Sequence, residues 1–195
     1  MSGYPENRTY HIHTDEIIDI CKRQGCVFEA SREVSIPAGG TVTSVFKTGN
    51  KPVILFARDI GYDGVGVNAF AYRDPNLSSN GSIEETTRNP SDINPQPATV
   101  EIYTSPTVVS IGAETRSPKY LFSNTSNQGS GQPAKTIESP QFILPNKLIV
   151  LTITNRDTNA AQNIFAELRW AEPTRIPSIV LNSDGTFNRY NGVLL

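Results

Sequence analysis

The chain has 195 residues and a mass of 21.3 kDa, a length typical of one domain with its own hydrophobic core. Charged residues make up 18 % of the chain, whereas Ser, Thr and Asn together number 51, and Gly and Pro number 14 each. This composition favours turns and β-structure and disfavours a helix bundle or a coiled coil. A net charge of −2 and a pI of about 5.7 disfavour nucleic-acid binding, because the chain has no basic field to hold a polyanion.

Two features of the sequence predict a protein without a membrane partner. No apolar run approaches the length of about 18 residues that a membrane-spanning helix needs. The first six residues lack the charged start and apolar stretch of a signal peptide. We therefore expect a protein that stays in the cytoplasm or is assembled into a larger structure there.

Residues 1–26 are expected to form a polar N-terminal arm, which contains both histidines and both cysteines. Within this arm the sequence predicts a short helix, Thr14–Gln24, with Gly25 in the left-handed position after its end. One side of this helix carries apolar residues, namely Ile17, Ile18 and Cys21. A helix of about ten residues is marginal alone, so we expect it to lie on its own domain or on a neighbouring chain.

Residues 27–171 predict one all-β domain. Short runs of β-forming residues alternate with turn sequences such as 37–40 and 145–146. The expected strands are 27–36, 41–47, 53–57, 66–73, 99–104, 107–111, 119–123, 147–155 and 164–170. So many short strands in one domain favour an antiparallel, jelly-roll-like β-sandwich.

Two long polar stretches, 74–98 and 124–140, interrupt these strands. Loops of this length in a compact domain are usually functional or poorly ordered, so both are candidate contact surfaces. The first has too few large aliphatic residues for a core of its own, and we expect contacts with its surroundings to hold it. Arg88 is the expected anchor, because one guanidinium can bond several carbonyl or carboxylate groups.

Residues 172–195 are expected to form a C-terminal extension beyond the sandwich. Residues 179–181 and 186–187 flank the turn sequence 182–185 and predict a hairpin. An isolated hairpin is barely stable in water, so we expect it to pair with the edge of the domain or with another chain.

The spacing of the candidate metal ligands supports no metal site. The arm has four residues with zinc-binding atoms, His11, His13, Cys21 and Cys26. However, His-x-His and Cys-x4-Cys are not the spacings of compact zinc sites, and two free thiols near the helix end are expected instead. Three aspartates stand in glycine-containing turns but lack the density of oxygen ligands that calcium requires, namely Asp59, Asp63 and Asp184. We expect no metal and no cofactor.

The sequence contains no catalytic constellation. Both histidines lie in the arm, away from the β-domain, and no Gly-x-Ser-x-Gly motif is present. No glycine-rich phosphate-binding loop precedes a helix. We therefore expect a protein that is not an enzyme.

Several turn and strand segments, taken together, resemble those of one known family of proteins. They are Tyr10-His11-Ile12-His13, the strand and turn at 27–40, Gly49-Asn50-Lys51-Pro52-Val53-Ile54-Leu55, Thr87-Arg88-Asn89 followed by residues 100–108, Phe142-Ile143-Leu144-Pro145-Asn146 running to 152–155, and Glu167-Leu168-Arg169-Trp170. On these segments, over roughly residues 10–172, the chain resembles the capsid decoration (cement) proteins of tailed bacteriophages. Members of that group usually end soon after the tryptophan strand, whereas this chain continues for 25 residues beyond Trp170.

The resemblance implies a non-catalytic β-sandwich protein that binds the outer capsid surface of a virion and stabilises the head. The implied partners are the major capsid protein and the other copies of a homotrimer, assembled in the host cytoplasm. Terminal arms spread over neighbouring subunits would raise the cost of separating them. The residues expected to bind these partners lie in the two ends of the chain and in the first long loop, namely Tyr4, Arg8, Tyr10, His11, His13, Arg88, Phe187, Tyr190, Leu194 and Leu195.

Two other functions stay open at this stage. Asn-rich loops and the tyrosines not committed to the core suit a carbohydrate- or receptor-binding virion module, although sugar binding is not favoured. A tail or neck component is the third interpretation, which the number of copies in a virion would separate from the first.

Overall fold

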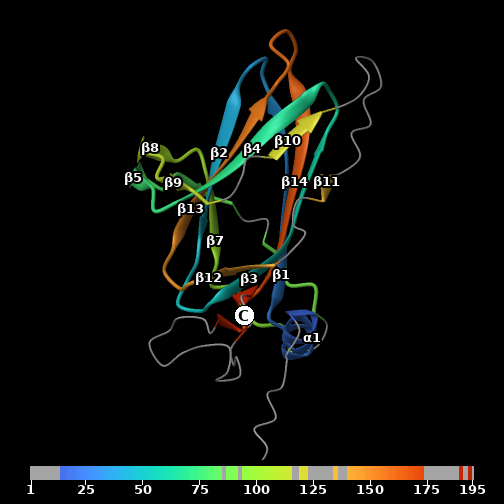
Figure 1. The fold of residues 1–195 in the computed structure, drawn as a ribbon, viewed down its shortest axis with the longest axis vertical. Helices are drawn as coiled ribbons and strands as arrows, with labels where there is room; N and C mark the ends of the chain where they lie inside the picture. Colours follow the sequence, from blue (N-terminus) through green and yellow to red (C-terminus); the bar gives the residue numbers. More distant parts are fainter. Residues whose placement is uncertain are drawn as a thin grey trace, which may run out of the picture.

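The fold is a sandwich of two antiparallel sheets. The computed structural model describes residues 14–84, 87–91, 94–115, 119–122, 134–135, 140–173, 189–190 and 193–194. Within these residues one sheet has five strands, in the order β1-β14-β3-β11 with β12 also paired to β3. The other has seven strands, in the order β10-β4-β13-β2-β7-β6 with β9 also paired to β4. Figure 1 shows the two sheets side by side, and the predicted antiparallel β-sandwich is confirmed, whereas its jelly-roll order of strands stays a prediction.

The strand bounds follow the sequence pattern closely along most of the chain. The five-stranded sheet contains β1 (Val27–Ile36), β3 (Val53–Tyr62), β11 (Ala134–Lys135), β12 (Gln141–Ile143) and β14 (Gln162–Ala171). The seven-stranded sheet contains β2 (Thr41–Lys47), β4 (Gly66–Arg73), β6 (Ser82–Ile83), β7 (Glu101–Thr104), β9 (Ala113–Glu114), β10 (Lys119–Phe122) and β13 (Leu148–Asn155). Two small sheets pair β5 (Asn76–Ser79) with β8 (Thr107–Ser110), and β15 (Arg189–Tyr190) with β16 (Val193–Leu194).

The five-stranded sheet pairs the first strand of the sandwich sequence with the last. β1 pairs with β14 over its whole length, from Val27 opposite Ala171 to Ile36 opposite Gln162. On its other side β14 pairs with β3, with an irregularity in register between Arg169 and Trp170. Because β14 lies between β1 and β3, this sheet cannot form until nearly the whole sandwich sequence is present.

The predicted helix is confirmed as α1 (Thr14–Gln24), and it lies on its own domain. Gly25 has a φ of +68°, and its backbone N–H donates to the carbonyl of Lys22. The backbone N–H of Cys26 donates to the carbonyl of Cys21. This pair of bonds satisfies the carbonyls at the helix end as in a Schellman motif. The apolar side predicted for the helix is buried, at Ile17, Ile18 and Cys21, so the helix shares the core of the sandwich.

The hydrophobic core consists of two clusters. The larger surrounds Trp170, whose ring stacks on Phe28 and meets Phe46 edge-on, and it includes the buried residues of the helix. The second contains Ile36, Ile60 and other apolar residues of β3, β4 and β14. The inner faces of both sheets contribute to both clusters.

The ribbon formed by β5 and β8 lies beside the seven-stranded sheet. Each of its four connections to that sheet contains a residue with positive φ, namely Asp74 (53°), Gly81 (90°), Ser105 (55°) and Gly112 (84°). In Figure 1 the ribbon lies on the far side of β2 and β13 from the five-stranded sheet.

The structure extends or adds to the strands expected from the sequence in several segments. β3 continues to Tyr62 instead of ending at residue 57, because pairing with β14 extends it through Asp59 and Gly61. The loop expected at 74–98 contains β5 and β6, and the loop expected at 124–140 contains β11, each short strand paired with another part of the chain. The hairpin predicted at 179–187 lies outside the described residues, which instead show β15 paired with β16.

Candidate functional site

Few of the residues predicted to bind partners lie in the described part of the chain. Seven lie outside it, namely Tyr4, Arg8, Tyr10, His11, His13, Phe187 and Leu195. Tyr190 and Leu194 lie in the small sheet of β15 and β16, where Tyr190 pairs with Val193 and Leu194 pairs with Arg189. Arg88 lies beside β1, so the structure places it on the sandwich itself.

The segment around Arg88 is held by its main chain. The N–H and carbonyl of Arg88 exchange hydrogen bonds with those of Glu29 in β1, at 2.8 and 2.9 Å. The side-chain amide of the next residue, Asn89, donates to the carbonyls of Gly25 and Gln96, at 2.7 and 2.8 Å. The expectation that contacts anchor this loop is therefore met, although backbone groups and Asn89 supply the bonds that the structure shows.

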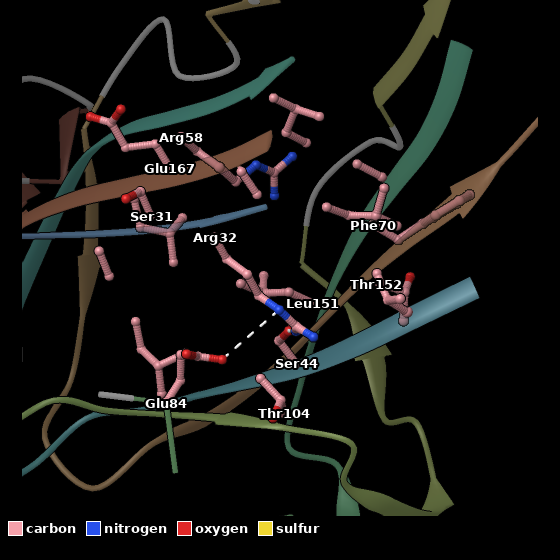
Figure 2. A pocket seen from close by; sticks show the side chains of 18 residues that line it. Ser31, Arg32, Ser44, Arg58, Phe70, Glu84, Thr104, Leu151, Thr152 and Glu167 are labelled. Atoms are coloured by element: carbon pink, nitrogen blue, oxygen red, sulfur yellow. Dashed lines mark hydrogen bonds and ion pairs between the residues drawn. The ribbon is translucent and has the colours of Figure 1, made fainter. Parts of the chain in front are cut away.

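A pocket lies between the two sheets, in the space that separates the two core clusters (Figure 2). It is open to solvent on one side, and the space within it is about 80 Å³. Seven strands, together with Glu84 just after β6, contribute its lining, namely Ala30, Ser31, Arg32, Val42, Ser44, Arg58, Ile60, Ala69, Phe70, Glu84, Ile102, Thr104, Leu151, Thr152, Ile153, Ala166, Glu167 and Leu168. Most of this surface is apolar.

Two arginines bring charge into this apolar space. Figure 2 shows Arg32 and Arg58 extending from different strands toward the space between the sheets. Nη1 of Arg32 donates to the Ser44 hydroxyl at 3.4 Å, and its Nε lies 3.9 Å from a carboxylate oxygen of Glu84. The Glu167 carboxylate forms its ion pair with Arg169. The pocket therefore combines apolar walls with two cationic side chains, and the contacts of Arg32 with Ser44 and Glu84 are long.

The alternation of side chains along β1 contains a signal for this pocket. Residues 28, 30, 32, 34 and 36 share one face of the strand, and Phe28 and Ile36 of that face lie in the core. Arg32 is thus a charged residue at an inward position, beside the small residue Ala30. Sequence reasoning treated this run only as a strand and missed the pocket.

The two cysteines are buried free thiols, as expected. The Cys26 thiol donates to the Cys21 carbonyl at 3.4 Å. A hydrogen bond with the Cys26 thiol, and then burial, raise the pKa of the Cys21 thiol. Because a thiol with a raised pKa stays protonated at neutral pH, Cys21 is not available as a nucleophile or as a thiolate ligand.

The turn aspartates serve the fold where the structure describes them. Asp63 accepts hydrogen bonds from the backbone and side-chain nitrogens of Asn163, at 2.7 and 2.8 Å, which joins the ends of β3 and β14. Asp59 lies within β3 and not in a turn. Asp184 is outside the described residues, and within them no three His, Cys, Asp or Glu side chains gather to hold a metal ion.

The ribbon exposes aliphatic side chains. All four residues of β8 are exposed, and Val109 retains 63 % of its accessible surface. Ile111 follows the strand at 38 %, and Ile83 in β6 is 55 % exposed. A two-stranded sheet has two free edges and little stability of its own, so the ribbon is a natural contact surface.

Comparison with known proteins adds no family assignment. No protein-family model matches the chain, and the curated proteins include no similar sequence. Among the described helices, none is both long and apolar enough to cross a membrane.

Proposed function

We propose that the chain is a non-catalytic capsid decoration protein of a tailed bacteriophage, which binds the major capsid protein on the outer surface of the head. The observation that best supports this proposal is the exposed ribbon, because its aliphatic side chains would be buried in a protein interface. The resemblance in the turn and strand signatures supplies the identity of the partner. The β-sandwich is a rigid body of the kind that such a role requires.

The proposed mechanism is mechanical. A homotrimer would lie across a junction between capsid subunits, with the ribbon and the terminal segments on different subunits. A specific interface buries about 800 Å² on each partner, and each added interface raises the free energy needed to separate the subunits. Packed DNA pushes outward on the head, so added interfaces would make the head more resistant to rupture.

Replacement of Val109 by Asp tests the ribbon as the contact surface. Val109 is 63 % exposed, so V109D should fold, but a carboxylate buried in the interface should greatly reduce the amount of protein on the particle. Val65 is the matched control, because it is an exposed valine (42 %) in the turn between β3 and β4. Equal occupancy of particles by V109D and V65D would show that the ribbon is not the capsid contact.

The number of copies in purified virions tests the function itself. Quantitative mass spectrometry should find this chain in proportion to the major capsid protein. A few copies per particle would instead support a tail or neck component. Glycan binding by the isolated protein, with no affinity for capsids, would support a carbohydrate- or receptor-binding module.

A further inference from the structure

The outer face of the five-stranded sheet carries an aromatic side chain where the solvent face of a sheet is usually polar. Arg32 of β1 lines the space between the sheets, so by alternation its neighbour Glu33 lies on the outer face. Phe165 of β14 pairs directly with Glu33 and therefore shares this face. Phe165 is 43 % exposed, although β14 is flanked by β1 on one side and β3 on the other. The ring thus lies in the middle of a sheet face and not at its rim.

The strand on the other side of Phe165 leaves the ring uncovered. Its partner in β3 is Gly61, which has no side chain. Gly61 does not have a positive φ, so its backbone conformation does not require glycine. A Cβ added there would meet the Cβ of Phe165 at 3.9 Å, an ordinary van der Waals distance, so a side chain would also fit. Neither conformation nor space explains this glycine, and its effect is to keep one side of the ring open.

Two carboxylates beside the ring have no cation of their own. Within the described part of the chain, neither Glu33 nor Asp59 forms a hydrogen bond or an ion pair through its side chain. Oδ1 of Asp59 accepts no hydrogen bond, although Lys135 pairs with this residue through its backbone. Asp59 also lies directly opposite Glu167, whose carboxylate is paired with Arg169. Like charges directly opposite each other destabilise a sheet, so this arrangement is not one that stability alone would favour.

We propose that this face binds an arginine-bearing segment of a partner protein. A guanidinium can stack on an aromatic ring and bond to a carboxylate at the same time, because its flat face and its N–H groups point in different directions. Cross-strand neighbours such as Phe165 and Glu33 have Cβ atoms about 5 Å apart, which places both groups within reach of one arginine. Asp59 adds negative charge on the side that Gly61 leaves open. A lysine ammonium is a compact point charge and cannot stack in this way.

This surface is separate from the ribbon of β5 and β8. In Figure 1 the ribbon lies on the far side of β2 and β13 from the five-stranded sheet, whereas Phe165 lies on the outer face of the five-stranded sheet itself. The inference therefore does not depend on the proposed capsid function.

Titration of the full chain with the blocked peptide acetyl-Ala-Arg-Ala-Arg-Ala-amide, followed in the amide ¹H–¹⁵N NMR spectrum, tests the proposal. We expect a dissociation constant of about 1 mM, because an exposed stacking contact and an exposed ion pair each contribute little. The shifts should be confined to β1, β3 and β14 around Phe165, and salt should weaken them by screening. The same peptide with lysine should bind at least about threefold more weakly, and the same peptide with glutamate should not bind.

Variants of the ring and of its neighbours locate the peptide. Phe165→Leu keeps an apolar side chain without a ring, and Glu33→Gln removes the charge, so each should weaken binding at least about threefold. Phe165→Tyr keeps a ring and should bind as the wild type does. Gly61→Val places a side chain against the ring and should weaken binding as well. Glu114→Gln, at an exposed position on the other sheet, is the control for loss of one carboxylate and should not change it.

Thermal unfolding verifies that each variant folds, and Glu33→Gln tests the site if a replacement of Phe165 or Gly61 does not fold. The proposal is overturned if the arginine peptide shifts no resonances on this face, if the glutamate peptide binds as tightly, or if folded F165L and E33Q both keep the affinity of the wild type.

Discussion

At the scale of single residues, Glu172 is the buried polar group that ties together the backbone around the Trp170 cluster of the core. It is fully buried, and its carboxylate accepts hydrogen bonds from the backbone N–H of Thr99 (2.7 Å), the hydroxyl of Thr99 (2.6 Å), the N–H of Val100 (3.1 Å) and the indole of Trp170 (3.0 Å). Its own N–H bonds to the Cys26 carbonyl. The side chain of Glu172 thus joins β14 to the segment that leads into β7, and its main chain joins β14 to the residue that follows the helix end.

Replacing Glu172 by Gln should therefore destabilise the protein strongly. An amide has one oxygen, so two of the donors would face an NH₂ group and lose their acceptor. We expect a loss of about 2 kcal/mol in the free energy of unfolding, because hydrogen bonds to a buried charged group are the strong ones. Urea unfolding measures this loss, with Glu114→Gln at an exposed position as the control. Equal midpoints for the two variants would show that Glu172 does not hold these segments together.

An ion pair on the outer face of the seven-stranded sheet predicts that the stability of the protein depends on pH. Nζ of Lys47 lies 2.6 Å from a carboxylate oxygen of Glu101, which also accepts from the Tyr103 hydroxyl at 2.7 Å. The hydrogen bond from Lys47 lowers the pKa of Glu101, and the bond to Glu101 raises the pKa of Lys47. The lowered carboxyl pKa adds stability above the ordinary glutamate pKa, and this stability is lost as the pH falls through the lowered value.

A double-mutant cycle of Lys47→Met and Glu101→Gln measures this coupling. Both side chains are about 40 % exposed, so we expect only about 0.5 kcal/mol at neutral pH. The coupling should vanish in acid, as Glu101 is protonated, and in strong alkali, as the pH rises through the raised pKa of Lys47. Unfolding in urea across this pH range gives the profile, and a coupling that stays constant into acid would contradict an ionic origin.

At the scale of elements, α1 shows how local and tertiary signals combine. The helix dipole, the glycine cap and the apolar side of the helix predict both of its ends correctly. What the sequence left open was the surface that covers this apolar side, and the structure shows that it is the domain's own core around Trp170. The helix therefore contributes to the stability of the sandwich.

Ile17→Ala tests this contribution. Ile17 is 2 % exposed within the larger core cluster, so its truncation should lower the free energy of unfolding by about 3 kcal/mol. Ile20, on the same helix and 38 % exposed, is a matched control, and I20A should change the value by less than about 0.5 kcal/mol. Similar unfolding midpoints for I17A and I20A would mean that the helix does not stabilise the domain.

Some strands could be predicted from their own sequence, whereas others are defined by the strand with which they pair. β1, β2 and β4 begin and end where alternation and turn residues predict, because their patterns are carried by their own side chains. β3 is longer than predicted, since its second half is set by pairing with β14 and not by its own sequence. The short strand β11 is likewise set by its partner, and no local pattern distinguishes it from a loop.

The pocket could not be predicted in the same way. Its lining comes from seven strands and from Glu84 beside an eighth, so it depends on which strands face each other across the sandwich. Arg32 at an inward position was the one local sign of it. The predicted contact residues at the chain ends lie largely outside the described residues, so their role stays a prediction.

At the scale of the whole molecule, the pairing of β1 with β14 makes the sandwich depend on strands far apart in the sequence. The cost of closing so large a loop comes before the contacts that offset it, so such topologies fold slowly and as a unit. β14 is also the neighbour of β3 and the strand that carries Trp170, the centre of the larger core cluster. Removing it takes away the middle of one sheet and the largest side chain of the core.

Two truncated chains, ending after Thr158 and after Pro173, test this dependence and the boundary of the domain together. The shorter chain lacks β14, so β1 and β3 lose their shared partner, and we expect an unfolded chain with no dispersion in its amide ¹H–¹⁵N NMR spectrum. The longer chain keeps β14 and the bonds made by Glu172, and we expect it to fold with most of the amide shifts of the full chain. Were the longer chain also unfolded, residues beyond 173 would be part of the folding unit and not an extension. Were the shorter chain folded, the central place of β14 in the five-stranded sheet would be wrong.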